Sequence, residues 1–213
     1  MKHLLRSVAL AGACALLVPG MMYATPSLAA PSSEAPEWAF GHAQTSSTSY
    51  PTKLDVLGVW AHPDDDASFS APCGVWGDLA DVRCGIMLTT RGEGGSNSVG
   101  SEAGPDLGLR RENEDRAAHV RDGTVDVYFL DRVDFFYNTS APLTHQLWNH
   151  DETLRRATQV VRETRPEILV TWPASFDAGH GNHQAASMLA WEVAQAAADP
   201  NRFPEQLSGP NAV

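Results

Sequence analysis

Short apolar runs, separated by helix-like stretches, most constrain the fold of this chain. The first run, at residues 54–60, is nearly continuous in apolar residues, which is typical of a strand buried on both faces of a sheet. Similar runs recur at residues 84–90, 125–130 and 167–172. We therefore expect four buried strands.

The stretches between these runs have the spacing of helices. Residues 107–120 and 151–164 are amphipathic, and residues 184–198 are rich in alanine. The stretch at 67–80 is the weakest candidate, because Pro72 and two glycines interrupt it. Strands that alternate with helices predict an α/β fold, Rossmann-like, in which helices cover both faces of a mostly parallel sheet.

Polar loops follow three of the four predicted strands. His62 comes just after the first strand, Arg91 just after the second, and His180 lies in the loop after the fourth. Parallel sheets of this kind bind their ligands beyond the carboxyl ends of the strands. We therefore expect the three loops to converge on one edge of the sheet and to form the functional site there.

The segment His62-Pro63-Asp64-Asp65-Asp66 places an imidazole and three carboxylates directly after a buried strand. Such a density of acidic groups is costly unless something positive binds there. A divalent cation suits the segment, since His62 and one aspartate offer a nitrogen and an oxygen ligand and Pro63 restricts the backbone. The alternative is a solvated acidic turn that caps the next helix.

Two histidines three residues apart, His180 and His183, form a second polar group at the start of the last predicted helix. A single histidine at a helix start is often structural, but a pair at the carboxyl edge of a sheet favours a functional role. With His62 and Asp65, one of the pair completes a set of three ligands. That leaves a position open for water, and the other histidine is free to handle protons.

Four motifs together carry a resemblance that any one of them would carry weakly. In chain order they are His62-Pro63-Asp64-Asp65, Arg91-Gly92-Glu93-Gly94-Gly95, Arg110-Arg111-Glu112 and His180-x-x-His183. In this order and setting the chain resembles the PIG-L/LmbE-like de-N-acetylases. The likeness extends over nearly all of the sequence after residue 29.

The resemblance implies a zinc ion held by His62, Asp65 and His183, although another divalent metal such as Fe²⁺ suits the same ligands. It implies Asp64 as the general base and His180 as the protonated partner of the reacting carbonyl. The implied reaction is hydrolysis of the N-acetyl group of an N-acetylglucosamine-type substrate. Two alternatives stay open: a catalytically weakened carbohydrate-binding protein on the same fold, and a metal-dependent esterase.

The sequence departs from the family pattern at three positions. Asp66 stands where the family usually has Glu, and Asn182 replaces the carboxylate that would orient the first histidine of the pair. Asp177 is our candidate substitute for that carboxylate. Some relatives have a tyrosine two residues before this histidine, and Ala178 occupies the corresponding position here.

Other charged residues of the motifs have two interpretations. Arg91 and Glu93 lie in a glycine-rich loop at the expected site, so we predict that they, together with Asp177, contact substrate; the alternative is a tight turn with solvated charges. The Arg110-Arg111-Glu112 segment starts a helix, where its charges are expected to form surface ion pairs.

The N-terminal residues predict export. Lys2 and Arg6 precede an apolar run at residues 8–22, and small residues lead to a cleavage site after Ala29. Residues 1–29 are therefore expected to be a signal peptide and the mature protein to be secreted. The apolar run is too short for a stable membrane anchor.

Removal of residues 1–29 takes away two basic residues and no acidic one, so the formal net charge changes from −11 to −13. Such an acidic chain disfavours nucleic acid as a partner, and the family resemblance implies a small-molecule or glycan substrate. Residues 30–51, rich in Ser, Thr, Pro and Ala, predict a disordered lead-in. Residues 52–213 are the expected deacetylase domain, which is either complete or truncated at its C-terminus.

Two cysteines remain after cleavage, Cys73 and Cys84. In an exported protein they form either a disulfide or two buried free thiols on a helix and the following strand.

Overall fold

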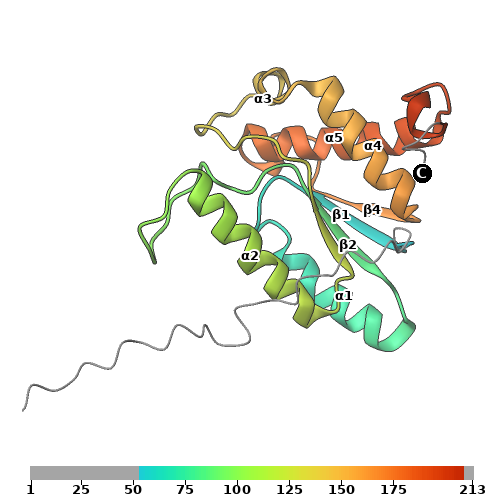
Figure 1. Ribbon diagram of the computed structural model, residues 1–213, viewed down its shortest axis with the longest axis horizontal. Helices are drawn as coiled ribbons and strands as arrows, with labels where there is room; N and C mark the ends of the chain where they lie inside the picture. The colour runs from blue at the N-terminus through green and yellow to red at the C-terminus, as the bar shows by residue number, and fades with distance from the viewer. Residues whose placement is uncertain (1–52, 209–213) are drawn as a thin grey trace, which may run out of the picture. The chain divides into compact units, whose positions relative to one another are not determined.

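A four-stranded parallel sheet forms the centre of the computed structural model, which describes residues 53–208 (Figure 1). The strands are β1 Val56–Trp60, β2 Cys84–Leu88, β3 Asp126–Phe129 and β4 Ile168–Val170, and they lie in the order β3-β2-β1-β4. The sequence prediction of a parallel α/β sheet is confirmed. The predicted signal peptide at 1–29 and lead-in at 30–51 lie outside the described residues.

Five α-helices cover the two faces of this sheet (Figure 1). On one face lie α1 Ala67–Ala80 and α2 Pro105–Asp122, and on the other lie α3 Ala141–Trp148, α4 His150–Thr164 and α5 Gly181–Ala198. Residues 53–208 also contain two short 3₁₀ turns, Phe176–Ala178 and Pro204–Gln206. Within residues 53–208 there is no helix both long and apolar enough to cross a membrane.

The two central strands differ from the two edge strands in their burial. All five residues of β1 and of β2 are buried, as the continuous apolar runs predict. Strand β3 is only partly buried, and in β4 the side chain of Ile168 is 56% exposed. The expectation of four strands buried on both faces is therefore wrong for the edges, because an edge strand has a neighbour on one side only.

Helix α3 is absent from the sequence prediction. It spans only eight residues, which is too short for its apolar spacing to stand out. Ser140 caps its start by accepting the backbone N–H of Leu143. Asn149 ends it in a left-handed conformation and, with its side chain, caps the start of α4.

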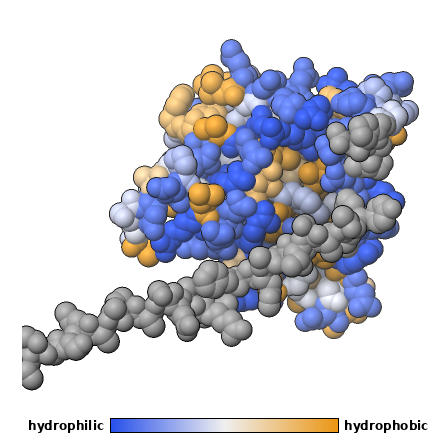
Figure 2. Space-filling view, viewed as in Figure 1, coloured by the Kyte–Doolittle hydropathy of each residue, from blue (hydrophilic) through white to orange (hydrophobic). Residues whose placement is uncertain are grey.

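Alanines let α5 approach the sheet closely. Ala185, Ala186 and Ala190 are buried on the helix, beside Leu189 and Val193 in the core. This packing places the N-terminus of α5, where His180 and His183 lie, at the carboxyl edge of the sheet. Seen from the same side as in Figure 1, the outer surface is mostly hydrophilic, and apolar side chains gather over α3 (Figure 2).

Cys73 on α1 and Cys84 at the start of β2 form a disulfide, which decides between the two alternatives left open by the sequence. The bond closes a loop between residues 11 positions apart. Because a crosslink of this length restricts the unfolded chain, we expect the Cys73→Ser/Cys84→Ser double variant to lose about 3 kcal/mol of unfolding free energy. Urea denaturation checks this, and an unchanged midpoint in the variant would contradict it.

Candidate metal centre and active site

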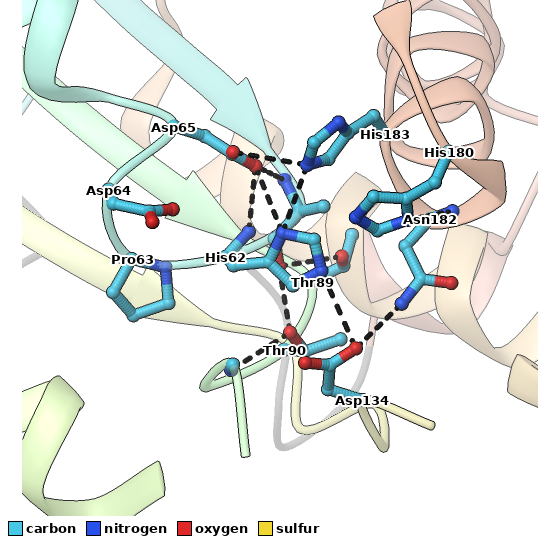
Figure 3. A network of polar contacts seen from close by, with 12 residues as sticks. His62, Pro63, Asp64, Asp65, Thr89, Thr90, Asp134, His180, Asn182 and His183 are labelled. Carbon is cyan, nitrogen blue, oxygen red and sulfur yellow. Dashed lines mark hydrogen bonds and ion pairs between the residues drawn. The ribbon is translucent and has the colours of Figure 1, made fainter. Parts of the chain in front are cut away.

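The β1–α1 turn and the start of α5 form two halves of one site (Figure 3). Asp65 folds back over the turn, and its Oδ2 accepts the backbone N–H groups of Ala61 at 3.1 Å and His62 at 3.0 Å. His183 reaches the same carboxylate from the first turn of α5. Its Nδ1 lies 2.8 Å from the carbonyl oxygen of Ala178, which leaves Nε2 facing the turn.

Three side chains offer donor atoms at nearly equal spacing. His62 Nδ1 lies 3.3 Å from Asp65 Oδ2 and 3.2 Å from His183 Nε2, and His183 Nε2 lies 3.2 Å from Asp65 Oδ1. A tetrahedral zinc ion with bonds of about 2.0–2.1 Å separates its ligand atoms by about 3.3–3.4 Å. The donor set and its spacing therefore fit a divalent cation, and the carbonyl partner of His183 is of the kind that orients a metal-binding imidazole.

His180 lies beside this triangle. Its ring centroid is 4.0 Å from that of His183 and 5.1 Å from that of His62, and ligand nitrogens of the three histidines lie within 4.8 Å of one another. His180 is also the N-cap of α5, where its Nδ1 accepts the backbone N–H of Asn182 at 3.4 Å. That contact leaves Nε2 to carry the proton of the neutral ring.

Charges around His62 favour its protonated form before a cation binds. Burial favours the neutral ring, but hydrogen bonds to Asp134 and Asp65 outweigh it and raise the pKa of His62 to about 9. Burial also opposes the charge on Asp65, yet His183 and His62 hold the pKa of this carboxyl well below its usual range. A cation that binds between them takes the place of the proton on His62.

We therefore expect cation binding at neutral pH to release about one proton per chain from His62. Since this proton is bound below a pKa of about 9, the apparent affinity should fall about tenfold for each unit of pH between 9 and 7. Titration calorimetry in buffers of different ionisation enthalpy measures the released proton. A heat that is independent of the buffer would contradict the expectation.

Asp64 differs from its neighbours in the turn because its side chain is 75% exposed and lies beside the metal triangle, not at one of its corners (Figure 3). Desolvation by the surrounding protein raises the pKa of Asp64, and the negative charge of Asp65 raises it further. The guanidinium of Arg111, 3.3 Å away, partly opposes this rise. Its backbone has a φ of 100°, a region that is strained for a residue with a side chain. The carboxylate is thus accessible to a substrate and close to the metal ligands.

The acidic turn is not a helix cap. Asp66 occupies the N-cap position of α1 but makes no capping hydrogen bond with its side chain, which is buried and bonded to His119 instead. The alternative interpretation of the segment as a solvated capping turn is therefore wrong.

Asp134 is a member of the site that the sequence analysis missed. Its buried carboxylate lies 3.5 Å from His62 Nε2 and accepts the side-chain amide of Asn182 at 2.8 Å (Figure 3). It also accepts the backbone N–H of Gly94, where a side chain would collide with the backbone of Asp134. Asp134 follows β3, so the rule that pointed to the other strand ends could have found it.

The site opens into a cavity of about 500 Å³. Polar side chains of the turn, Asp134, Arg111 and the two histidines of α5 line one part of it. The rings of Phe135, Tyr137 and Trp172 line another part, and the ring centroid of Tyr137 lies 5.2 Å from that of His180. A pocket of this size with polar groups beside aromatic rings can hold a sugar.

Three residues predicted to contact substrate lie outside the lining of this cavity. Arg91 forms ion pairs with Glu112 and Asp131, and Glu93 accepts the backbone N–H groups of Arg91 and Asp134. Their hydrogen bonds hold the glycine-rich loop in place.

Asp177 is exposed and bonded to Ser175, whereas Asp134 lies 3.5 Å from His62 Nε2. Arg111, expected on a solvated face, instead lines the cavity and donates to the carbonyl oxygens of Gly92 and Pro63.

The fold and this site define a class of α/β proteins with a candidate metal centre at the carboxyl edge of a parallel sheet. A family model described as PIG-L, GlcNAc-PI de-N-acetylase, matches residues 57–194. The chain therefore belongs to the PIG-L family, as its motifs indicated.

Relatives in sequence include deacetylases of a small glycoside. The 1D-myo-inositol 2-acetamido-2-deoxy-alpha-D-glucopyranoside deacetylase 1 of Catenulispora acidiphila is 32% identical over 70% of this chain and 51% of that protein. The corresponding deacetylase of Geodermatophilus obscurus is 30% identical over 70% of this chain and 56% of its own length. The chain thus spans about half the length of these relatives.

Solved structures share the fold. N,N'-diacetylchitobiose deacetylase from Pyrococcus horikoshii has a TM-score of 0.57 at 22% identity, over 80% of this chain and 59% of that one. The 4-carboxy-2-hydroxymuconate hydratase of Pseudomonas putida has a TM-score of 0.56 at 20% identity, over 71% of this chain and 59% of that one. Because a deacetylase and a hydratase share the fold, the side chains of the site must decide the activity.

Proposed function

We propose that this protein is a secreted, zinc-dependent N-deacetylase that hydrolyses the acetamide of an N-acetylglucosamine-type substrate. The observation that carries the proposal is the exposed carboxylate of Asp64 beside the His62, Asp65 and His183 triangle. A carbohydrate-binding protein needs no base next to a metal ligand, whereas hydrolysis of an amide does. The sequence relatives named as deacetylases of an acetamido sugar support the same substrate class.

Each side chain has a step to perform. His62, Asp65 and His183 would hold the cation, which when bound supplies Lewis acidity for water and for a carbonyl oxygen. Asp64 accepts a proton from the attacking water, and its raised pKa makes it a better acceptor than an ordinary aspartate. The protonated Asp64 can then return this proton to the departing amine.

His180 is placed to stabilise the oxyanion that develops on the acetamide. Burial and the nearby His183 and His62 lower the pKa of His180 to about 4, so the ring is neutral at pH 7. A neutral ring whose Nδ1 accepts from Asn182 donates through its Nε2–H. We therefore assign His180 a hydrogen-bond donor role in place of the imidazolium that the family resemblance implied.

Recognition of the sugar falls to the other side chains of the cavity. Asp134 and Arg111 offer an acceptor and donors for sugar hydroxyl groups, and Tyr137 and Trp172 offer ring faces against which a pyranose can pack. Asp134, Phe135 and Tyr137 lie on the loop after β3, Trp172 follows β4, and Arg111 lies on α2. A substrate that fills the cavity would contact these separate elements at once.

The deciding experiment is acetate release by the zinc-loaded protein from a panel of N-acetylated monosaccharides and glycosides, with an acetate ester in parallel. We expect acetate from N-acetylglucosamine-type compounds. Release from the ester alone would favour the metal-dependent esterase, and sugar binding without acetate release would favour the carbohydrate-binding protein. Absence of both binding and turnover would reject the proposal.

Export is the remaining part of the proposal, and it is supported by the basic and apolar N-terminal residues. Expression of the full chain in a secreting bacterial host, followed by N-terminal sequencing of the protein in the medium, tests it. We expect the secreted protein to begin at Ala30. Retention of the chain in the cytoplasm with Met1 intact would contradict export.

A further inference from the structure

A buried ionic cluster lies between the β1–α1 turn, which carries Asp64, and helix α2. It consists of Asp66, Asp115, His119 and Asp122 and is called here the His119 cluster. His119 Nε2 lies 2.8 Å from Asp66 Oδ2 and 3.6 Å from Asp115 Oδ1, and His119 Nδ1 lies 2.8 Å from Asp122 Oδ2. Asp66 and His119 are only 2% and 3% exposed, so water cannot screen their charges.

The imidazole at the centre of this cluster is charged at neutral pH. Burial favours the neutral ring, but hydrogen bonds to Asp115 and Asp66 raise the pKa of His119 to about 10. Both ring nitrogens then donate, one to Asp66 and one to Asp122. A carboxylate as deeply buried as Asp66 requires such a partner, because an unpaired buried charge is strongly destabilising.

The second carboxylate oxygen of Asp66 contacts the backbone of the β1–α1 turn. Asp66 Oδ1 accepts the backbone N–H of Asp64 at 3.2 Å. Asp64 is the residue with a φ of 100°, a strained conformation that persists only when the surroundings enforce it. A continuous line of hydrogen bonds thus runs from α2 through His119 and Asp66 to the backbone of the proposed base.

We propose that His119 is a positioning residue for the reaction: by holding Asp66, it keeps the strained backbone of Asp64 in the conformation that aims the carboxylate into the cavity. The geometry of the line does not depend on the activity, whereas its effect on turnover rests on the proposed function. Removing His119 should therefore alter the placement of Asp64 while leaving the ligand triangle in place.

The test compares His119→Leu, which removes both donors, with His119→Gln, which retains one N–H that can reach Asp66. In the zinc-loaded protein we expect kcat to fall about 10- to 100-fold for the Leu variant, with KM and zinc content within twofold of wild type. The Gln variant should recover most of this loss. Val193→Ala is the control, because it removes volume from a buried position of α5 in the hydrophobic core, beside Leu57 and Leu189, and does not change the turn.

A second measurement does not require turnover. Hydrogen exchange of the Asp64 amide, followed by NMR, should be faster in the Leu variant than in wild type and unchanged in Val193→Ala. If the Leu variant does not fold, the same measurement is made on the Gln variant. Its neutral amide bonds Asp66 more weakly than the charged imidazole does, so exchange of the Asp64 amide should again be faster than in wild type.

The proposal is overturned by either of two results. One is a folded Leu variant whose kcat and Asp64 exchange both stay within twofold of wild type. The other is an equal loss of kcat in Val193→Ala at the same melting temperature, which would indicate a purely structural role. A wild-type protein without deacetylase activity would reject the proposed function alone, since the exchange measurement still decides the role of His119.

Discussion

Replacement of Asp64 by Asn is expected to lower kcat for acetamide hydrolysis by about 10²- to 10⁴-fold, the range that general-base catalysis supplies. The amide has nearly the same size as the carboxylate but cannot accept the proton of the attacking water. Because Asp64 lies outside the ligand triangle, its replacement should leave the zinc content of the protein unchanged. Steady-state acetate release and metal analysis on the same preparation measure the two effects.

Asp177→Asn is the matched control for this substitution. Asp177 is another exposed aspartate near the α5 end of the site, but it does not line the cavity. We expect its variant to retain kcat within about twofold, as surface substitutions away from a site usually do. A comparable loss in both variants, or a loss of zinc in the Asp64 variant, would contradict the assignment of Asp64 as the base.

The second large effect concerns the metal. His183→Ala removes one of the three ligands at the corners of the triangle, and we expect the zinc content to fall from about one ion per chain to below about 0.1. Turnover should fall in proportion to the bound metal. Metal analysis after dialysis against a weak chelator gives the measurement.

His145→Ala provides the comparison for this experiment. His145, His150 and Glu192 also bring three donor atoms within 4.8 Å, where helices α3, α4 and α5 meet and outside the lining of the cavity. If the zinc is bound by the triangle, the His145 variant keeps its full metal content and activity. Loss of zinc from the His145 variant instead of the His183 variant would place the metal at the wrong group for the proposed reaction.

The sequence predicts the strand and helix order well because this information is local. Continuous apolar runs mark β1 and β2, and the amphipathic spacing marks α4. Helix α3 was not predicted because it has only eight residues. Its ends are set by the capping residues Ser140 and Asn149 and not by a recognisable apolar spacing. The exposure of β4 depends on its position at the sheet edge, which no property of its own sequence reveals.

The site was predictable only in part for a similar reason. His62, Asp65 and His183 stand out because their motifs combine metal-binding side chains with a strand end. Arg111 and Glu112 are neighbours on one helix, and the sequence alone cannot show that Arg111 turns into the cavity while Glu112 pairs with Arg91. The partners of buried charges come from elements far apart in the chain, so the fold is needed to identify them.

The distance along the chain between the two halves of the site has a consequence for how the protein matures. His62 and His183 are 121 residues apart, just after β1 and in α5, yet their nitrogens lie 3.2 Å from each other. Joining them requires closing a long loop, which contributes an entropic barrier to folding. A metal ion added during refolding should therefore bind only late, after the whole sheet has assembled. The rate of metal uptake then reports the rate of the last folding step.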